Sequence, residues 1–430
     1  MSSVRLLPPA TLTQPGLIQA TIPLASSKSE SNRALIIDAL TGFRCDLKNL
    51  STARDTQTMI RLLNSTDPVA DVLDAGTTMR FLTAYFAVTG ESTPGQQKTM
   101  TGTHRMCERP IGILVDALRT LGADITYLKE EGYPPLQLNG FSASGNNQIS
   151  IRGDVSSQYI SALLMIAPLL PNGITLELVG PIGSRPYIEM TMEQMRFFGA
   201  DVQANWDSKT IVVAPQPYIP AAYAIESDWS GASYWYSVSA LAKDETAEIT
   251  LLGLKAKSLQ GDSAIADLMQ AFGVQSTFTE AGVRLTKCPT SDSLAWDFTD
   301  CPDLAQTVAV CAAMKGITLR LTGIESLKIK ETDRVLALQT ELQKIGAELV
   351  EIEPNHRYEV RQTGTKPSAP ATIATYDDHR MAMAFAPVAM RQEIIIEEPG
   401  VVAKSYPSFW DDMARVATVE FSSEETQHPS

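Results

Sequence analysis

The sequence predicts a mixed α/β protein of two domains, and three observations support this fold class. The chain has 430 residues, more than a single hydrophobic core ordinarily organises. A polar residue, a helix of small and apolar residues and a closing turn recur in this order six times. Between these helices, amphipathic helices end in glycine and lead into alternating, strand-like runs. Six such units divide naturally into three and three, so we expect three repeats in each domain.

The six apolar helices are rich in Ala, Ser and Met and are apolar on nearly every side, so we expect them to be buried. From the second copy onward they start roughly 72 to 80 residues apart, a period long enough for a whole supersecondary unit. Their predicted starts lie near Ser31, Gly76, Ser156, Ser230, Pro302 and Asp377. Serine often caps a helix N-terminus, and we predict that role for Ser31 and Ser156.

The amphipathic helices share one ending. Each ends in a hydrophobic residue and a glycine, and the run that follows alternates between polar and apolar residues or is β-branched. The glycines are Gly122, Gly199, Gly273 and Gly346. Glycine accepts the left-handed conformation with which many helices end. After the last of these glycines, residues 348–352 read as a strand, and residues 357–360 are a plausible hairpin partner for it.

The first repeat has little sequence before Ser31, so one of its strands should come from elsewhere in the chain. A link between the extreme N-terminus and the C-terminal half is expected to supply this strand. The crossings between domains are placed at residues 23–26 and near 221–227, where Pro215, Pro217 and Pro220 mark a connector. The predicted domains are residues 1–25 with 226–430, and residues 26–225. Residues 422–430 are expected to be disordered.

Composition excludes several classes of partner. The formal net charge of −14 argues against nucleic acid and anionic membrane as main partners. The five cysteines and four histidines show no metal-ligand spacing, so we expect no metal, and reduced thiols in a cytosolic protein. The longest apolar run, residues 160–170, is too short to span a bilayer.

Polar and charged residues gather where the buried helices begin. An apolar helix that starts with charge needs water or a ligand to face, and a helix N-terminus favours anions. If the six helices are related by symmetry, their starts should converge on the face between the domains, where ligand sites commonly form. The residues concerned are Lys28, Ser29, Asn32, Arg33, Asp74, Thr77, Arg80, Ser156, Ser157, Gln158, Asp228, Ser230, Asp303, Asp378, His379 and Arg380.

Residues 330–334, with the sequence KETDR, are expected to open a helix and to form an anion site. Lys330 and Arg334 supply cations, and Glu331 places a carboxylate among them. A solvated first turn with internal ion pairs would explain this segment taken alone. Loops that carry Arg105, Arg109, Arg185 and Lys404 add further cations. Arginine forks suit carboxylate and phosphate groups, so the set predicts substrates with several negative charges.

Seven segments, in order, resemble the enolpyruvyl transferase family, in its branch that acts on shikimate 3-phosphate. They are SKSESNRAL, DAGTTMR, RMCERPIG, SSQYISALLM, SRPYI, KETDR and DDHRMAMAF, and the match spans residues 26–406. The resemblance implies an α/β (α+β) fold of two inside-out α/β barrel domains. Each domain would hold three βαβαββ repeats around buried parallel helices, with the active site in the cleft between the domains.

The resemblance further implies transfer of the enolpyruvyl group of phosphoenolpyruvate to the 5-hydroxyl of shikimate 3-phosphate through a tetrahedral intermediate. It implies no cofactor and no metal, two small-molecule substrates, and a cytoplasmic monomer. Glu331 would act as acid towards the methylene carbon and Asp303 as base, with Lys28 assisting and His379 orienting its neighbours.

The binding residues are also carried over from the resemblance. Shikimate 3-phosphate would contact Lys28, Ser29, Arg33, Ser156, Ser157, Gln158, Ser184, Tyr187, Asp303, Ser326 and Lys330. Phosphoenolpyruvate would contact Lys28, Gly76, Arg105, Gln158, Arg334, Arg380 and Lys404.

The chain departs from the family pattern at several positions. Leu24 and Ala25 replace the usual Pro-Gly of the first crossing, and Ser326 stands where some members have Asn. Asp74 replaces the common Asn, and its extra negative charge could weaken phosphoenolpyruvate binding. Phe81 stands where Pro is usual. We hypothesise that Phe81 shifts the helix carrying Gly76 and lowers sensitivity to glyphosate.

Two alternative functions fit parts of the sequence. The sister enzyme that acts on UDP-N-acetylglucosamine uses a cysteine in the loop before an Arg-Pro helix start. Cys107 lies in such a loop, but without the glycine-rich setting, so we interpret it as incidental. A catalytically inactive anion-binding protein would lack one of the charged residues, yet Lys28, Asp303, Glu331 and His379 are all present.

Overall fold

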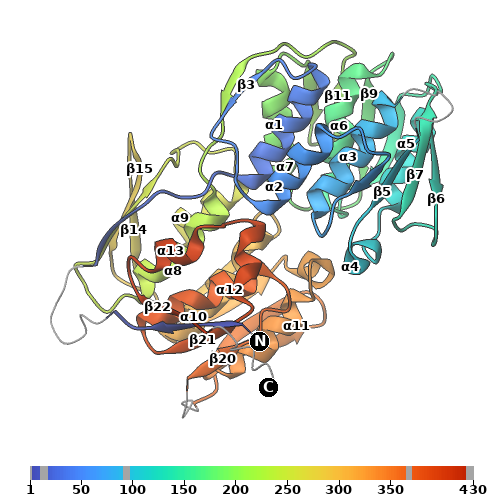
Figure 1. The fold of residues 1–430 in the computed structure, drawn as a ribbon. Coiled ribbons are helices and arrows are strands. Elements are labelled where there is room, and N and C mark those ends of the chain that lie inside the picture. The colour runs from blue at the N-terminus through green and yellow to red at the C-terminus, as the bar shows by residue number, and fades with distance from the viewer. Residues whose placement is uncertain (1, 10–17, 91–96, 365–369, 423–430) are drawn as a thin grey trace, which may run out of the picture. The chain divides into compact units, whose positions relative to one another are not determined.

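The computed structural model describes residues 2–9, 18–90, 97–364 and 370–422. The chain divides into two compact units, unit 1 with Met1–Ala25 and Glu226–Ser430 and unit 2 with Ser26–Ile225 (Figure 1). Each unit mixes strands and helices and has its own hydrophobic core. Residues 423–430, which belong to the tail expected to be disordered, lie outside the described residues.

Unit 1 contains three four-stranded sheets that share one strand order. In each sheet the first two strands run parallel and the remaining pairs are antiparallel. The first sheet holds β2 (Gln19–Ile22), β13 (Glu248–Leu252), β15 (Gly282–Lys287) and β14 (Val274–Thr279). The second holds β16 (Ser293–Asp297), β17 (Thr318–Thr322), β19 (Arg357–Gln362) and β18 (Ala347–Glu353). The third holds β20 (Ala371–Ile373), β21 (Ile394–Glu397), β1 (Ser3–Leu7) and β22 (Thr418–Ser422). Pairing of β18 with β19 confirms the predicted hairpin.

Unit 2 repeats this sheet twice and a shortened version once. The first sheet holds β4 (Val69–Asp71), β5 (Lys98–Thr101), β7 (Leu136–Phe141) and β6 (Ala123–Tyr127). The second holds β8 (Gln148–Arg152), β9 (Ile174–Val179), β11 (Thr210–Val213) and β10 (Val202–Asn205). The third has only β3 (Asp46–Lys48), in parallel with β12 (Ala222–Ala224). The first repeat therefore takes a strand from the far end of unit 2, and not from a link between the N-terminus and the C-terminal half, which was expected to supply it.

The six apolar helices form and are largely buried, because they have no polar face to offer to water. They are α1 (Lys28–Leu40), α3 (Gly76–Thr89), α6 (Ser157–Ile166), α8 (Trp229–Leu241), α10 (Ala305–Lys315) and α12 (His379–Phe385). Three of them border short 3-10 turns, η2 (Ala167–Leu169), η4 (Pro302–Leu304) and η6 (Ala386–Met390). Within unit 1, α10 packs against α8 and α12; within unit 2, α3 packs against α1 and α6 (Figure 1).

Only one of the two predicted serine caps is correct. Ser156 is the N-cap of α6, and its Oγ accepts from the Gln158 backbone N–H. Helix α1, however, begins at Lys28 with Ser27 as its N-cap. The Oγ of Ser31 lies inside the helix and accepts from the Ser51 backbone N–H instead. The prediction for Ser31 was wrong because two serines compete for the start of α1 and the earlier one caps it.

The remaining helices are shorter or more exposed on one side. They are α2 (Arg54–Leu63), α4 (His104–Cys107), α5 (Gly112–Leu121), α7 (Arg185–Phe197), η3 (Gly261–Ala264), α9 (Ile265–Leu268), η5 (Glu325–Ile329), α11 (Arg334–Gln343), η7 (Pro399–Lys404) and α13 (Phe409–Met413). The four predicted glycine caps are confirmed, since Gly122, Gly199, Gly273 and Gly346 have φ values of 115°, 85°, 85° and 84°. No helix among the described residues is long and apolar enough to cross a membrane.

Helix α11 starts later than predicted. It begins at Arg334, and Asp333 is its N-cap, with Oδ1 accepting from the Leu336 backbone N–H at 3.0 Å. Lys330 and Glu331 therefore lie in the loop between η5 and α11. Aspartate is a strong capping residue, so its carboxylate closes the helix end at Asp333 and leaves the preceding residues non-helical.

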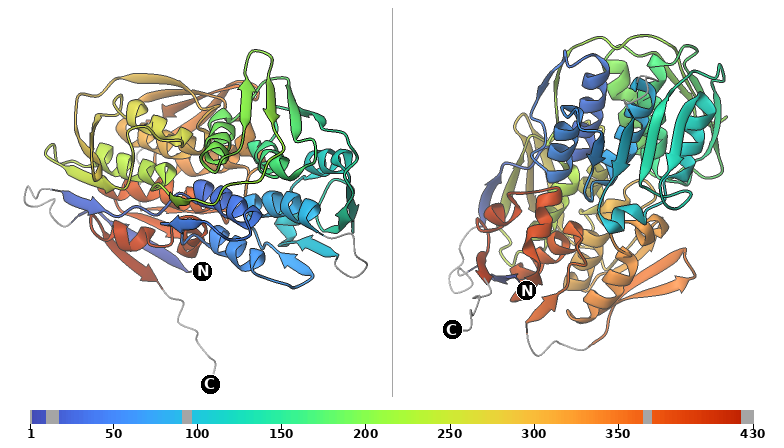
Figure 2. Two further views of the ribbon diagram at one scale, coloured as in Figure 1. Left: turned by 90° about the horizontal axis from the view of Figure 1, so that it is seen from above. Right: turned by 45° about the vertical axis from the view of Figure 1, so that its right-hand side comes forward.

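The N-terminal strand β1 is an inner strand of its sheet. It pairs with β21 on one side and β22 on the other, so both of its edges are hydrogen-bonded. Figure 2 shows this dark blue strand among the red C-terminal elements. Val4 and Leu6 point into the core and are fully buried. The predicted link between the N-terminus and the C-terminal half is confirmed.

Replacing Leu6 by Ala should destabilise unit 1 by about 2–5 kcal/mol, because it leaves a cavity beside a doubly paired strand. Urea unfolding followed by tryptophan fluorescence would measure this as a lower midpoint. Arg5→Ala is the matched control, since Arg5 points outward from the same strand and should leave the midpoint nearly unchanged. Equal midpoints for the wild type and Leu6→Ala would contradict the central position of β1.

Candidate active site

Arg334, the first residue of α11, is bonded to three carboxylates of unit 1. Its Nε donates to Asp378 Oδ2 at 2.6 Å, its Nη1 to Asp303 Oδ1 at 3.0 Å and its Nη2 to Glu331 Oε2 at 2.8 Å. The side chain is only 2% exposed. Burial alone would lower the pKa of Arg334, but the charges of Asp378, Glu331 and Asp303 outweigh it and raise the pKa. Arg334 thus ties together the starts of α10, α11 and α12.

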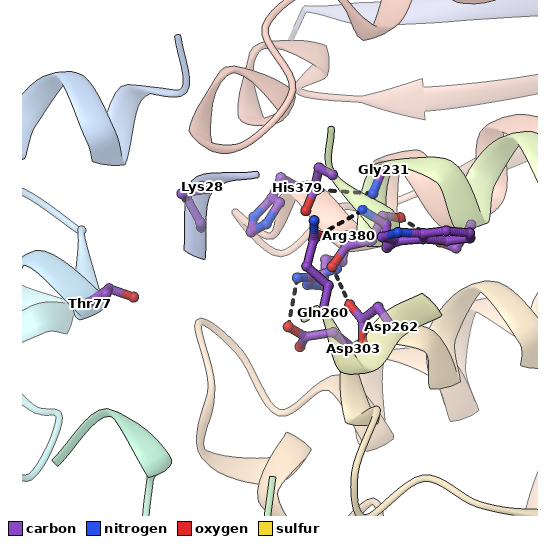
Figure 3. Close-up of polar contacts among 12 residues, drawn as sticks. Lys28, Thr77, Gly231, Gln260, Asp262, Asp303, His379 and Arg380 are labelled. Carbon is purple, nitrogen blue, oxygen red and sulfur yellow. Dashed lines mark hydrogen bonds and ion pairs between the residues drawn. The ribbon is translucent and has the colours of Figure 1, made fainter. Parts of the chain in front are cut away.

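Arg380 makes a second contact with the same carboxylate. Its Nη2 donates to Asp303 Oδ2 at 2.7 Å, so both oxygens of Asp303 accept from arginines (Figure 3). Its Nη1 lies 3.5 Å from the Tyr234 hydroxyl. Burial would raise the pKa of Asp303, but Arg380, Lys330 and Arg334 lower it well below its usual range. Asp303 is therefore held firmly as a carboxylate.

Glu331 and His379 complete the charged group of unit 1. Lys404 Nζ lies 3.5 Å from Glu331 Oε1, while Arg334 holds the other oxygen. Glu331 keeps 16% of its side chain exposed, so a ligand can reach it. His379 is buried, with Nδ1 3.7 Å from Asp378 Oδ1. We call this set the Arg334 cluster: Asp303, Glu331, Arg334, Asp378, His379, Arg380 and Lys404.

The Arg334 cluster contains as many arginines and lysines as carboxylates. Three carboxylates face Arg334, Arg380 and Lys404. Lys330 adds a further positive charge that acts on Asp303. Buried charges of this kind are stable only when they are paired and hydrogen-bonded. An anionic ligand could therefore bind by exchanging places with one of the protein's own carboxylates.

In unit 2 the polar residues of four helix starts are connected. Lys28, on the first turn of α1, makes an ion pair with Asp55 of α2 at 3.0 Å. The Thr78 hydroxyl of α3 donates to the Asp55 backbone carbonyl at 3.2 Å. On the same turn of α3, Thr77 accepts from the Gln158 side chain of α6 at 3.0 Å. The starts of α1, α2, α3 and α6 therefore lie together within unit 2. The convergence of all six starts on the face between the domains stays a prediction.

Arg33 occupies a more internal position than a substrate-binding role alone would require. Its Nε donates to Thr191 at 2.7 Å and its Nη2 to Ser161 at 3.2 Å, and its side chain is buried. The guanidinium also lies over the rings of Phe81 and Tyr187, at 5.3 and 5.7 Å. Burial lowers the pKa of Arg33 to about 10. Within unit 2 the side chain of Arg33 therefore connects α1 with α3, α6 and α7.

The other predicted binding residues of unit 2 lie at helix starts. Ser156 and Ser157 open α6, Ser29 lies on the first turn of α1, and Tyr187 lies on the first turn of α7. Ser184 precedes α7 in a left-handed conformation with φ of 53°, which is uncommon for serine. Left-handed non-glycine residues concentrate at functional sites.

Gly76 lies against a guanidinium. A Cβ added to this first residue of α3 would come 2.6 Å from Arg109 Nη1, so glycine lets the arginine approach the helix start. Arg105, on α4, is half exposed and pairs with Glu108 at 3.3 Å. Ser326 lies exposed on η5, four residues before Lys330.

Two departures from the family pattern have structural consequences. Asp74 pairs with Arg54 at 2.8 Å, so its extra charge is offset by a neighbouring cation. Phe81 is buried and covers Arg33. The hypotheses about phosphoenolpyruvate affinity and glyphosate sensitivity stay predictions. Cys107 is half-buried, and its thiol lies 3.7 Å from the Gly102 carbonyl.

Sequence reasoning missed two members of these networks. Asp55 was overlooked because it sits in an amphipathic helix, where an acid in the first turn is ordinary. Asp378 was noted as a helix start but was given no role, although it makes the shortest contact with Arg334. No group of histidine, cysteine and acidic residues that could hold a metal occurs in the described part of the chain.

Unit 1 thus holds the Arg334 cluster, and unit 2 holds a second group of connected polar helix starts. A family model described as EPSP synthase (3-phosphoshikimate 1-carboxyvinyltransferase) matches residues 64–413. The chain belongs to this family and is a transferase.

Relatives named 3-phosphoshikimate 1-carboxyvinyltransferase match over nearly the whole chain. One from Bacteroides fragilis strain YCH46 is 50% identical over 407 residues, covering 94% of this chain and 97% of the relative. One from Escherichia coli strain K12 / DH10B is 36% identical over 435 residues, covering 95% and 98%. The structure of an EPSP synthase from Acinetobacter baumannii superposes with a TM-score of 0.75, covering 98% of this chain and all of that chain, at 19% identity. The last comparison supports the fold alone.

Replacing Arg334 by Met should destabilise unit 1 by about 3–5 kcal/mol, because three carboxylates lose a buried partner. Urea unfolding would show this as a lower midpoint. Arg320→Met serves as control, since Arg320 is 59% exposed and pairs with Glu359 on the sheet surface. An unchanged midpoint in Arg334→Met would show that other cations compensate for its loss.

Proposed function

We propose that the Arg334 cluster and the connected helix starts of unit 2 act on one substrate pair, phosphoenolpyruvate and shikimate 3-phosphate. The reaction transfers the enolpyruvyl group to the 5-hydroxyl, giving 5-enolpyruvylshikimate 3-phosphate and phosphate, in the shikimate pathway towards aromatic amino acids. Membership of the family supports the reaction. The observation that carries the proposal is the pair of carboxylates, Asp303 and Glu331, bonded to the same buried arginine.

Phosphoenolpyruvate is proposed to bind to Arg334, Arg380 and Lys404, together with Lys28, Gly76, Arg105 and Gln158. Three of these cations pair with the protein's own carboxylates in the structure. The carboxylate and phosphate of the substrate supply equivalent oxygen acceptors. Binding is then an exchange of partners, in which the substrate takes hydrogen bonds that Asp303 and Glu331 previously accepted.

Shikimate 3-phosphate is proposed to bind to Lys28, Ser29, Ser156, Ser157, Gln158, Ser184 and Tyr187, with Asp303, Ser326 and Lys330 on unit 1. Helix starts suit the phosphate ester, because their free N–H groups and serine hydroxyls donate hydrogen bonds to it. Arg33 is retained in the proposal as a contact near the phosphate or ring hydroxyls. Its buried bonds to Thr191 and Ser161 also make it a support for α1.

The proton transfers are assigned to Asp303 and Glu331. Addition of the 5-hydroxyl to C2 of phosphoenolpyruvate requires a proton at C3 and removal of the hydroxyl proton, which gives the tetrahedral intermediate. Glu331 would supply the first proton and Asp303 would accept the second. As the intermediate collapses, Glu331 would take a proton back from C3 and Lys28 would stabilise the departing phosphate, which restores the double bond of the enolpyruvyl group. His379 would orient Asp378 and its neighbours.

Substrate binding would also activate Asp303 as a base. In the free protein Arg380 and Arg334 keep the pKa of Asp303 low, which makes it a weak proton acceptor. When both arginines donate some of their hydrogen bonds to phosphoenolpyruvate, they stabilise the ionised carboxylate of Asp303 less. The pKa of Asp303 should rise when the second substrate is in place, which delays proton removal until the complex is complete.

The finer structural features of the family belong to the same proposal. Each unit would be an inside-out barrel, with sheets outside and the apolar helices at the centre; this is supported by the burial of every residue of α8. The enzyme would act as a cytoplasmic monomer without cofactor or metal. Light scattering in solution would test the monomeric state.

Replacing Glu331 by Gln should lower kcat about 10²–10⁴-fold, because the acid that protonates C3 is lost. Phosphate release from phosphoenolpyruvate with shikimate 3-phosphate measures this. Glu325→Gln is the matched control, since Glu325 is an exposed glutamate on the nearby η5 turn. Full activity of Glu331→Gln would remove Glu331 from the mechanism.

The same assay with UDP-N-acetylglucosamine tests the alternative substrate. We expect no phosphate release with the sugar nucleotide and no effect of Cys107→Ser on the shikimate reaction. Release with the sugar nucleotide alone would overturn the proposal and return Cys107 to consideration as a catalytic residue.

Replacing Arg380 by Lys should raise the KM for phosphoenolpyruvate about 10–100-fold, because one ammonium cannot reproduce a planar two-point contact. The KM for shikimate 3-phosphate should change much less. Steady-state kinetics with each substrate varied in turn would separate the effects on the two KM values. A larger rise in the KM for shikimate 3-phosphate would show that Arg380 binds that substrate instead.

A further inference from the structure

A pocket on the exposed face of the second sheet of unit 1 has no part in the proposed reaction. It has a volume of about 360 Å³, which lies in the range of pockets that hold small organic ligands. We call it the Arg320 pocket, and its lining residues are Arg320, Ile352, Arg357, Glu359 and Arg361. None of them belongs to the Arg334 cluster. Three of the five carry a positive charge, although the formal net charge of the chain is −14.

The pairing of the strands brings the three arginines together. Arg357, Glu359 and Arg361 occupy alternate positions of β19, so their side chains point to one face of the sheet. The two residues between them point to the other face and are buried. Arg320 of β17 lies directly opposite Glu359 in antiparallel register, which places it on the same face. This face of the sheet therefore carries a group of arginines around one carboxylate.

Glu359 fixes two of these guanidinium groups through the same nitrogen atom. Arg320 Nε donates to Glu359 Oε2 at 2.9 Å, and Arg361 Nε donates to Glu359 Oε1 at 2.6 Å. The Nη groups of both arginines have no hydrogen-bond partner among the residues that the structure describes. Their side chains are 59% and 45% exposed, so a ligand can reach them. A guanidinium held at Nε presents its two Nη groups as a fork that fits a carboxylate or a phosphate.

Arg357 adds a third positive charge to the pocket. Its Nη2 pairs with Glu353 Oε1 at 2.8 Å, and its side chain is 44% exposed. Glu348 lies opposite Arg361 in the sheet, but no ion pair joins these two side chains in the described part of the chain. Glu359 is the one carboxylate among the five lining residues. Because the arginines outnumber it, the pocket can accept further negative charge.

We propose that the Arg320 pocket binds a small organic anion that carries at least two carboxylate or phosphate groups. One group would accept from the Nη groups that Glu359 leaves available on Arg320 and Arg361. A second group would accept from Arg357, and the carbon frame between them would lie against Ile352. Such binding adds acceptors without breaking either bond to Glu359, so the arginines are already oriented before the ligand arrives. The proposal goes beyond enolpyruvyl transfer and does not depend on it.

Modification of arginines by phenylglyoxal, followed by peptide mass mapping, would measure binding residue by residue. Citrate is a probe with carboxylates alone and pyrophosphate is a probe with phosphates alone, each compared with chloride at equal ionic strength. A bound probe should slow the modification of Arg320 and Arg361 about tenfold at roughly ten times its Kd. Arg284, an exposed arginine on β15 of the first sheet, is the internal control and should react at an unchanged rate. Protection by one probe alone would support the proposal and identify the anionic group of the ligand.

Arg361→Lys tests whether the planar fork matters or only its charge. The ammonium keeps the positive charge but cannot make the two-point contact, so the Kd obtained from protection of Arg320 should rise about tenfold. Arg284→Lys is the matched control variant and should leave this Kd unchanged. The proposal would be overturned by no protection with either probe, by equal slowing at Arg284, or by an unchanged Kd in Arg361→Lys. In the last case diffuse attraction between charges would explain the binding.

Phosphate release from phosphoenolpyruvate with shikimate 3-phosphate separates the Arg320 pocket from the active site. Arg361→Lys should keep the kcat and both KM values of the wild type, since Arg361 lies outside the Arg334 cluster. A fall in kcat with unchanged protection of Arg320 would show that Arg361 supports the fold of unit 1 and does not bind the ligand. Protection in a wild type without activity would refute the proposed function and leave the Arg320 pocket standing.

Discussion

In unit 1 the buried guanidinium of Arg334 neutralises three carboxylates, one of which, Asp378, is fully buried. Asp303, Glu331 and Asp378 lie on different segments, and each would resist burial as an unpaired anion. One planar guanidinium with five N–H donors can bond all three at once. The same bonds fix the relative positions of the starts of α10, α11 and α12. The stability of this part of unit 1 and the positions of Asp303 and Glu331 therefore come from one set of interactions.

The repeated architecture explains why polar residues gather in each unit. A helix without a polar face is buried along its length, so its sides offer no room for charge. Its N-terminus still exposes N–H groups that need acceptors. When three such helices pack side by side in one unit, their polar starts lie together next to an otherwise apolar core. In unit 2 the ion pair between Lys28 and Asp55 and the hydrogen bond from Gln158 to Thr77 belong to such a group of helix starts.

The chain as a whole is negatively charged, whereas the Arg334 cluster contains three positively charged side chains. With a formal net charge of −14, the protein as a whole repels anions, and attraction has to be local. In the proposed function the cations of the Arg334 cluster would meet this need, and in the structure they pair with carboxylates of the protein. Such a site would exchange one set of anions for another, so that no cation would be left buried and unpaired.

Local signals in the sequence were enough for the repeat, the buried helices and the glycine caps, because each depends on residues close together in the chain. The same holds for the capping role of Ser156. Tertiary structure decided the points that rest on partners distant in sequence. Ser27 caps α1 in place of Ser31, Asp333 delays the start of α11, Arg54 offsets Asp74, and Asp55 pairs with Lys28. A carboxylate has the same appearance in a sequence whether it faces water, a cation or another acid, and only the packing of the chain determines which neighbour sets its charge.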